Sequence, residues 1–250
     1  MPLYSVIKRY ILENMLKKPP ACTAVIAAAG LSQRCRGEDK LFYDIKNKPV
    51  LAYTLDAFQK CDSIDDIIVV AQEENFDRIA GICRKYGFKK VSKIMKGGRA
   101  RAESVINGVY AASGKASLIA IHDGARPCID TEIIEKTIQA AAKYHAAAPA
   151  VSVTSTIKKV DNGVISKTVD REGIYEVQTP QIFRAEIIKG ALTNAVRKSV
   201  DITDDCMAVE MIGVPVRITE GSRNNIKITE PEDLLIVESY LTAGVSEKCE

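Results

Sequence analysis

Three short strand-like segments, each followed by a loop that carries glycine, constrain the fold of this chain most strongly. They span residues 21–29, 89–95 and 117–122, and the loops after them begin with Gly30, Gly97-Gly98 and Asp123-Gly124. Short apolar runs that end at turn residues are typical of buried strands. A fourth buried strand is predicted at residues 66–71.

Helical patterns fill the spaces between these strands. Apolar residues recur at helical spacing over residues 50–60, 75–86, 101–112 and 131–144, and the second of these segments ends at Gly87. Strands that alternate with helices indicate a mostly parallel sheet with helices on both faces. The sequence therefore predicts an α/β, Rossmann-like fold. Further helices are expected at 184–198, 204–211 and 231–240, and a further strand at 215–219.

One segment departs from this alternation. Residues 151–169 are rich in β-branched side chains and contain Asp161-Asn162-Gly163 at their middle. Such a pattern predicts a β-hairpin. We expect a projecting hairpin arm over about residues 151–180. The arm either pairs with a second subunit or folds back on its own domain.

The chain is predicted to form one domain, over residues 21–243, with a tail at 244–250. Residues 1–20 precede it as an extension that is expected to be helical, because its apolar residues fall at helical spacing before Pro19-Pro20. We favour a short helix docked on the body, with a membrane-surface anchor as the alternative.

Composition excludes several functional classes. A net charge of only +3 gives no general nucleic-acid surface. The 7 cysteines form no C-x-x-C pair and the chain has only 2 histidines, which disfavours a zinc site and favours reduced thiols in the cytoplasm. No apolar run reaches the roughly 20 residues that span a membrane.

The three loops are expected to meet at the carboxyl ends of the strands, where open α/β sheets bind ligands. They match neither the dinucleotide fingerprint nor the Walker loop. They do offer backbone N–H groups, the cations Arg34 and Lys40, and the carboxylate of Asp123. This combination suits a nucleoside triphosphate, with Asp123 as a ligand of Mg²⁺.

Six ordered strings give the chain a more specific resemblance. The strings are AVIAAAGLSQR…DK, GGRARAESV, IHDGARP, TVDR, QTPQIF and NNIKITEPEDL. In this order they resemble the 2-C-methyl-D-erythritol 4-phosphate cytidylyltransferases of the non-mevalonate isoprenoid pathway. The resemblance implies a nucleotidyltransferase that uses CTP and methylerythritol 4-phosphate, with Mg²⁺, and releases pyrophosphate. It also implies a homodimer in which the hairpin arm crosses to the partner.

The resemblance implies roles for individual residues. Arg34 and Lys40 would stabilise the reacting phosphorus, Lys227 would complete the phosphate pocket, and Asp123 would bind the metal. The residues implied to bind CTP are Ala28, Ala29, Gly30, Gly98, Ser104 and Gly124. The residues implied to bind the second substrate are Arg126, Thr156, Arg171 and Thr179, of which Thr156 and Arg171 would act in the neighbouring active site, Arg171 as a catalytic residue.

Plainer explanations exist for four of these side chains, and His122 also has one. Ser104 could be an ordinary surface residue of a helix, and Lys227 a solvated lysine on a strand. Thr156 could be a common hairpin threonine, and Arg171 could form a local ion pair with Asp170. His122 is expected to pack or to bond the backbone rather than to catalyse.

Three positions depart from the family pattern. Ser32 stands where a second glycine is usual, Asp39 where a proline often precedes the loop lysine, and Arg99 where an acidic residue is frequent. Two other activities also remain open from the sequence. One is the same transfer to ribitol 5-phosphate, and the other is a nucleotide-binding regulator without turnover.

Overall fold

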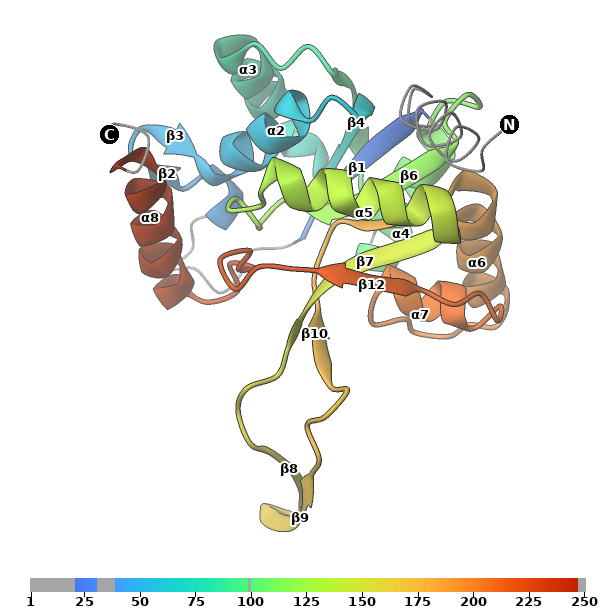
Figure 1. Cartoon of the computed structure of the whole chain (residues 1–250). Helices are drawn as coiled ribbons and strands as arrows, with labels where there is room; N and C mark the ends of the chain where they lie inside the picture. The colour runs from blue at the N-terminus through green and yellow to red at the C-terminus, as the bar shows by residue number, and fades with distance from the viewer. Residues whose placement is uncertain (1–20, 31–38, 99, 247–250) are drawn as a thin grey trace, which may run out of the picture.

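The computed structural model describes residues 21–30, 39–98 and 100–246, and within them a mixed sheet of eight strands forms the centre (Figure 1). Seven strands follow the order β10-β7-β11-β6-β1-β4-β5, and β12 pairs with β7. In chain order the strands are β1 (Cys22–Ala28), β4 (Ile64–Ala71), β5 (Val91–Lys96), β6 (Leu118–Asp123), β7 (Ala146–Ser152), β10 (Tyr175–Val177), β11 (Gln181–Arg184) and β12 (Arg217–Glu220).

The parallel part of the sheet is the part that the sequence predicts. Strands β6, β1, β4 and β5 run parallel to one another. Strand β11 then inserts antiparallel between β6 and β7, and β10 pairs antiparallel with β7. The prediction of a mostly parallel α/β sheet is confirmed, and the antiparallel strands at one side are additions to it.

Helices cover both faces of the sheet. The helices are α2 (Val50–Lys60), α3 (Phe76–Tyr86), α4 (Arg101–Ala111), α5 (Thr131–Tyr144), α6 (Ala185–Arg197), α7 (Asp205–Glu210) and α8 (Pro231–Ser246). Helices α2, α3, α5 and α8 contribute to one buried cluster, and α4, α6 and α7 to another. Neighbouring residues of β1 divide between the clusters, Ile26 to the first and Val25 to the second. This alternation is the period-2 pattern of a strand that is buried on both faces.

Helix α4 packs closely against the sheet at Gly108. A Cβ atom on Gly108 would stand 2.4 Å from Cγ1 of Val25 and 2.8 Å from Cγ2 of Val70. Only glycine at this position allows the approach without displacing those side chains. The contact fixes the height of α4 above β1 and β4, and with it the position of the residues that begin the helix.

The predicted hairpin is present as β8 (Ile157–Asp161) and β9 (Val164–Val169), which project away from the body (Figure 1). Asn162 and Gly163 join them with φ angles of 50° and 80°, both in the left-handed region that a tight hairpin turn requires. Most side chains of the arm are exposed.

Two short hairpin strands and two 3-10 helices complete the described chain. They are β2 (Asp44–Ile45), β3 (Lys48–Pro49), η1 (Lys40–Phe42) and η2 (Glu73–Asn75). None of the described helices is both long and apolar enough to cross a membrane. The expected helix at residues 1–20 and most of the expected tail lie outside the described residues. Helix α8 continues to Ser246, beyond its predicted end at residue 240.

Candidate active site

A cavity of about 720 Å³ opens at the carboxyl ends of β1, β5 and β6. This volume suits a small-molecule ligand. Its walls come from the segment after β1, the loop between β5 and α4, the end of β6, and two lysines from elsewhere in the chain. The predicted residues that line it are Ala28, Ala29, Gly30, Lys40, Gly98, Ser104, Asp123 and Lys227. The three strand ends therefore meet, as the sequence predicts.

Five other predicted residues, all within the described part of the chain, do not line this cavity. Gly124, Arg126 and Thr179 are buried beside Asp123, in the wall behind it. Thr156 and Arg171 are exposed on the arm, where the guanidinium of Arg171 donates to the carbonyl of Thr154. Arg34, Ser32 and Arg99 lie outside the described residues, so the roles predicted for them stay predictions.

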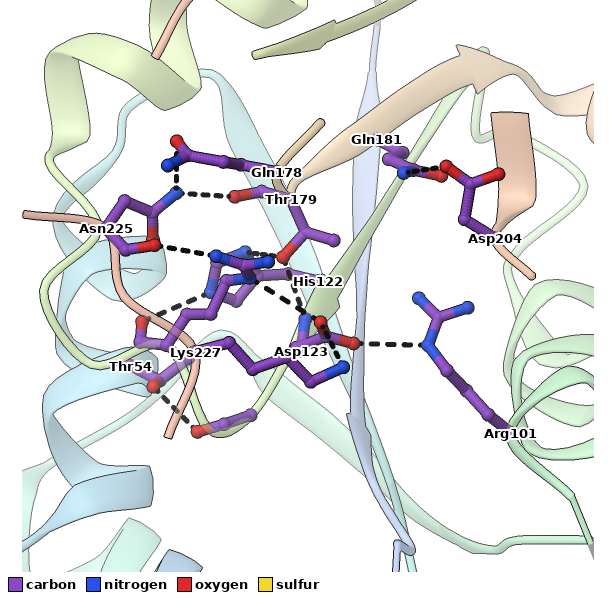
Figure 2. A network of polar contacts seen from close by, with 12 residues as sticks. Thr54, Arg101, His122, Asp123, Gln178, Thr179, Gln181, Asp204, Asn225 and Lys227 are labelled. Carbon is purple, nitrogen blue, oxygen red and sulfur yellow. Dashed lines mark hydrogen bonds and ion pairs between the residues drawn. The ribbon is translucent and has the colours of Figure 1, made fainter. Parts of the chain in front are cut away.

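Asp123 is the centre of the cavity's polar wall (Figure 2). Nζ of Lys227 lies 3.0 Å from its Oδ2, and Nε of Arg126 lies 3.5 Å from the same oxygen. Nε of Arg101 lies 3.2 Å from Oδ1. Three cations from three separate segments thus surround one carboxylate.

These cations decide the charge of Asp123. Burial alone would raise the pKa of the carboxyl, but the charges of Arg101, Lys227 and Arg126 outweigh it and hold that pKa well below its usual range. Asp123 is therefore ionised throughout the physiological range. The cavity wall offers a fixed negative charge among positive groups.

Lys227 reaches Asp123 from a segment that is not a strand. Residues 226–229 have no strand assignment, although the sequence suggested a strand there. Their place is fixed instead by a hydrogen bond from the Ile228 amide to the carbonyl of Ala125, at 2.9 Å. The Lys227 side chain is 38% exposed and ion-paired, which rules out the plain solvated lysine.

Ser104 shapes the loop between β5 and α4. Its side chain is only 3% exposed, so it is not a surface residue of the helix. Its Oγ accepts a hydrogen bond from the Gly98 amide at 3.0 Å and donates to the carbonyl of Ala100 at 3.1 Å. A Cβ atom on Gly98 would stand 2.2 Å from Cβ of Glu103, so this close turn requires glycine.

His122 and Thr179 support Asp123 from behind. The Thr179 hydroxyl accepts a hydrogen bond from the Asp123 amide at 3.1 Å and lies 3.0 Å from Nδ1 of His122. Burial lowers the pKa of His122 to about 3, so its ring is neutral, and it packs on Phe58 with ring centroids 4.9 Å apart. The packing role predicted for His122 is confirmed. The Thr179 hydroxyl, which was predicted to bind the second substrate, contacts the Asp123 amide and the His122 ring instead of lining the cavity.

Two residues of this network have no predicted role. Arg101 and Asp205 form an ion pair of 2.9 Å between Nη2 and Oδ2. Both lie in segments with recognisable patterns, GGRARAESV and ITDDCMAVE, but nothing in either string says that they touch. Only the contact between α4 and the start of α7 reveals the pair.

Asp123 also suits the one metal that the sequence implies. Within the described ranges, no group of three or more His, Cys, Asp and Glu residues could hold a metal ion. Mg²⁺ needs only one or two carboxylates when phosphate oxygens and waters supply its other ligands. An ionised carboxylate that lines a cavity fits that donor set.

Comparison with known proteins identifies relatives over nearly the whole described chain. The family model of 2-C-methyl-D-erythritol 4-phosphate cytidylyltransferase matches residues 22–243. A protein of that name from Clostridium acetobutylicum is 44% identical over 221 residues, which are 87% of this chain and 96% of the relative.

Solved structures show the same likeness. That of 4-diphosphocytidyl-2C-methyl-D-erythritol synthase from Anaerococcus prevotii is 29% identical, with a TM-score of 0.80 over 90% of this chain and 97% of the other. That of 2-C-methyl-D-erythritol 4-phosphate cytidylyltransferase from Thermus thermophilus is also 29% identical, with a TM-score of 0.74 over 88% and 98%.

Proposed function

Because the chain belongs to the 2-C-methyl-D-erythritol 4-phosphate cytidylyltransferase family, we propose that its cavity binds CTP and methylerythritol 4-phosphate around Asp123. The enzyme transfers the cytidylyl group of CTP to methylerythritol 4-phosphate, giving 4-diphosphocytidyl-2-C-methyl-D-erythritol and pyrophosphate in isoprenoid precursor biosynthesis. The observation that carries the assignment of the site is the ionised Asp123 between three cations at the meeting point of the strand ends.

The reaction needs no strong general base. A phosphate oxygen of methylerythritol 4-phosphate is already anionic, and it forms a new bond to the α-phosphorus of CTP. The bond from that phosphorus to the bridging oxygen breaks, and the electron pair leaves with pyrophosphate. Catalysis then depends on positioning and on neutralising the charge that gathers at phosphorus.

The cavity divides these tasks among its walls. Small residues at Ala28, Ala29 and Gly30 let phosphate oxygens approach the backbone. Lys40 and Lys227 bring two ammonium groups to the cavity, where they can neutralise the reacting phosphates. The turn of Gly98, held by Ser104, then faces the cytosine.

Magnesium is proposed as the resident ion. Asp123 would hold it, with Arg101, Arg126 and Lys227 beside this carboxylate. When bound, the ion supplies positive charge to the triphosphate.

A homodimer is proposed on the chemistry of the arm. Val160, Val164 and Ile165 expose 52%, 68% and 60% of their surface on a hairpin of two strands. Such a hairpin is marginally stable alone in water, so a second copy is its natural support. Arg171 and Thr156 would then reach the neighbour's cavity. A cytoplasmic location is proposed because the described cysteines are free thiols.

A pyrophosphate-release assay with CTP tests the activity. With methylerythritol 4-phosphate we expect turnover. With ribitol 5-phosphate we expect kcat/KM to be at least about tenfold lower, because a polar pocket rejects a substrate whose hydroxyls are misplaced. Preference for ribitol 5-phosphate would overturn the substrate. Binding of CTP without turnover on either alcohol would support a regulator instead.

Mixing two inactive variants tests the shared active site. Lys40→Ala removes a cation from the body and Arg171→Ala removes one from the arm. In a twofold dimer that exchanges arms, each mixed dimer regains one intact site, so about a quarter of wild-type activity should return at equal amounts. In the matched control, the Lys40→Ala protein is mixed with a Lys40→Ala/Arg171→Ala double variant. No mixed dimer then has an intact site, so no activity should return. Absence of recovery after verified subunit exchange would show that each site is built within one chain.

A further inference from the structure

Asp205 is a buried carboxylate that the reaction described above does not use. Its side chain is fully buried, and among the residues that the structure describes its Oδ1 has no hydrogen-bond partner. Burying a half-satisfied carboxylate is costly, and an apolar side chain of similar size would avoid the cost. The position therefore serves something other than packing.

The backbone around Asp205 is held firmly by Gln181. Oε1 of Gln181 accepts hydrogen bonds of 3.0 Å from the amides of both Asp205 and Cys206. Nε2 of Gln181 donates to Oδ2 of Asp204 at 2.9 Å. Since Gln181 lies in β11, beside β6, these bonds tie the start of α7 to the strand that ends in Asp123.

Arg101 connects this anchored carboxylate to the cavity. Its Nη2 bonds Oδ2 of Asp205, while its Nε bonds Oδ1 of Asp123. The charges of both carboxylates outweigh burial and raise the pKa of Arg101 beyond its usual range, so the guanidinium stays charged. Because the guanidinium is planar and rigid, holding one of its edges against Asp205 also fixes the orientation of the edge that binds the Asp123 carboxylate.

We propose that Asp205, acting through Arg101, fixes the orientation of the Asp123 carboxylate, and that both are positioning residues for cytidylyl transfer. Lys227 and Arg126 share Oδ2 of Asp123, whereas Arg101 holds Oδ1. Without Arg101 the carboxylate can rotate toward the two cations on its other side. The inference rests on the activity given above.

A double-variant cycle tests this coupling. Arg101→Ala is expected to lower kcat about 10- to 100-fold, and Asp205→Asn about tenfold, while KM for CTP stays within about threefold, because the loss is in orientation. The combined variant should be no slower than Arg101→Ala alone, since Asp205 acts only through Arg101. Arg197→Ala and Asp201→Asn are matched controls from exposed positions on α6 and before α7, and should keep wild-type rates.

Thermal unfolding separates positioning from a merely structural role. Arg101→Ala leaves Asp205 buried without its partner, so the unfolding temperature should fall, and adding Asp205→Asn should restore part of it. We expect this recovery of stability without recovery of kcat. If both the unfolding temperature and kcat recovered, the pair of Arg101 and Asp205 would have only a structural role, and the inference would be overturned.

The other outcomes are equally distinct. Additive losses of kcat would mean that Asp205 does not act through Arg101. A rise in KM for CTP with unchanged kcat would make Arg101 a nucleotide-binding residue. Either result, with an active wild type, overturns this inference alone, whereas a wild type that releases no pyrophosphate overturns the proposed function and the inference with it.

Discussion

Replacing Asp123 with asparagine is expected to lower kcat/KM by about a thousandfold in the pyrophosphate-release assay. The substitution keeps the size of the side chain and removes its charge. Arg101, Arg126 and Lys227 then face a neutral amide instead of the carboxylate that orients them. Removing one preorganised electrostatic group from an active site typically costs two to three orders of magnitude in kcat. The ligand that we propose for Mg²⁺ is lost at the same time.

An exposed aspartate supplies the control for this variant. Asp62→Asn removes the same charge from an exposed loop just before β4. This loop lies at the opposite end of the strand from the carboxyl ends that form the cavity, so the variant should keep wild-type kcat/KM. The unfolding temperatures of both variants should be measured, and their rates of pyrophosphate release should be compared at a temperature below the lower of the two. An Asp123→Asn enzyme within tenfold of wild type would remove Asp123 from the centre of the mechanism.

Truncating Lys227 is expected to lower kcat/KM for methylerythritol 4-phosphate by about 100-fold. The ammonium lies 3.0 Å from Asp123 and lines the cavity in which we propose that the reacting phosphates bind. Removing one such electrostatic group typically costs two to three orders of magnitude. Lys227→Arg should recover part of the loss, because the charge returns with a different shape.

Lys115→Ala is the matched control for that measurement. Lys115 is exposed just before β6, at the opposite end of the strand that Asp123 terminates. Its removal takes the same charge from the protein without reaching the cavity, so kcat/KM should not change. If Lys115→Ala and Lys227→Ala lowered the rate equally, net charge rather than the local ammonium would explain the effect.

The elements with strong local signals could be predicted from the sequence almost to the residue. Helices α2 and α5 have the predicted bounds, and α3 ends at Gly87, whose φ of 69° is the left-handed conformation that ends a helix. The hairpin turn could be predicted from its two central residues alone, Asn162 and Gly163. In each case the information lies within a few positions of the element that it forms.

Elements that depend on distant partners could not be predicted in the same way. Strand β7 reads AAAPAVS, which has weak strand propensity, and it exists because β11, β10 and β12 all pair with it. The short strands β10 and β11 carry too few residues for a periodic pattern. A strand was expected around Lys227, but residues 226–229 form no strand and are held to Ala125 by a hydrogen bond from the Ile228 amide.

The sequence by itself determined the α/β alternation, the hairpin, the family, and eight of the residues that line the cavity, because each is encoded in local pattern or in ordered motifs. The tertiary structure decided which charges meet. Arg101, Lys227 and Asp205 are far apart along the chain. Only the packing of α4, α7 and the segment before α8 brings Arg101 and Lys227 to Asp123, and Asp205 to Arg101. It likewise turned the Thr179 hydroxyl inward to the Asp123 amide, because a buried amide at the end of a strand requires an acceptor.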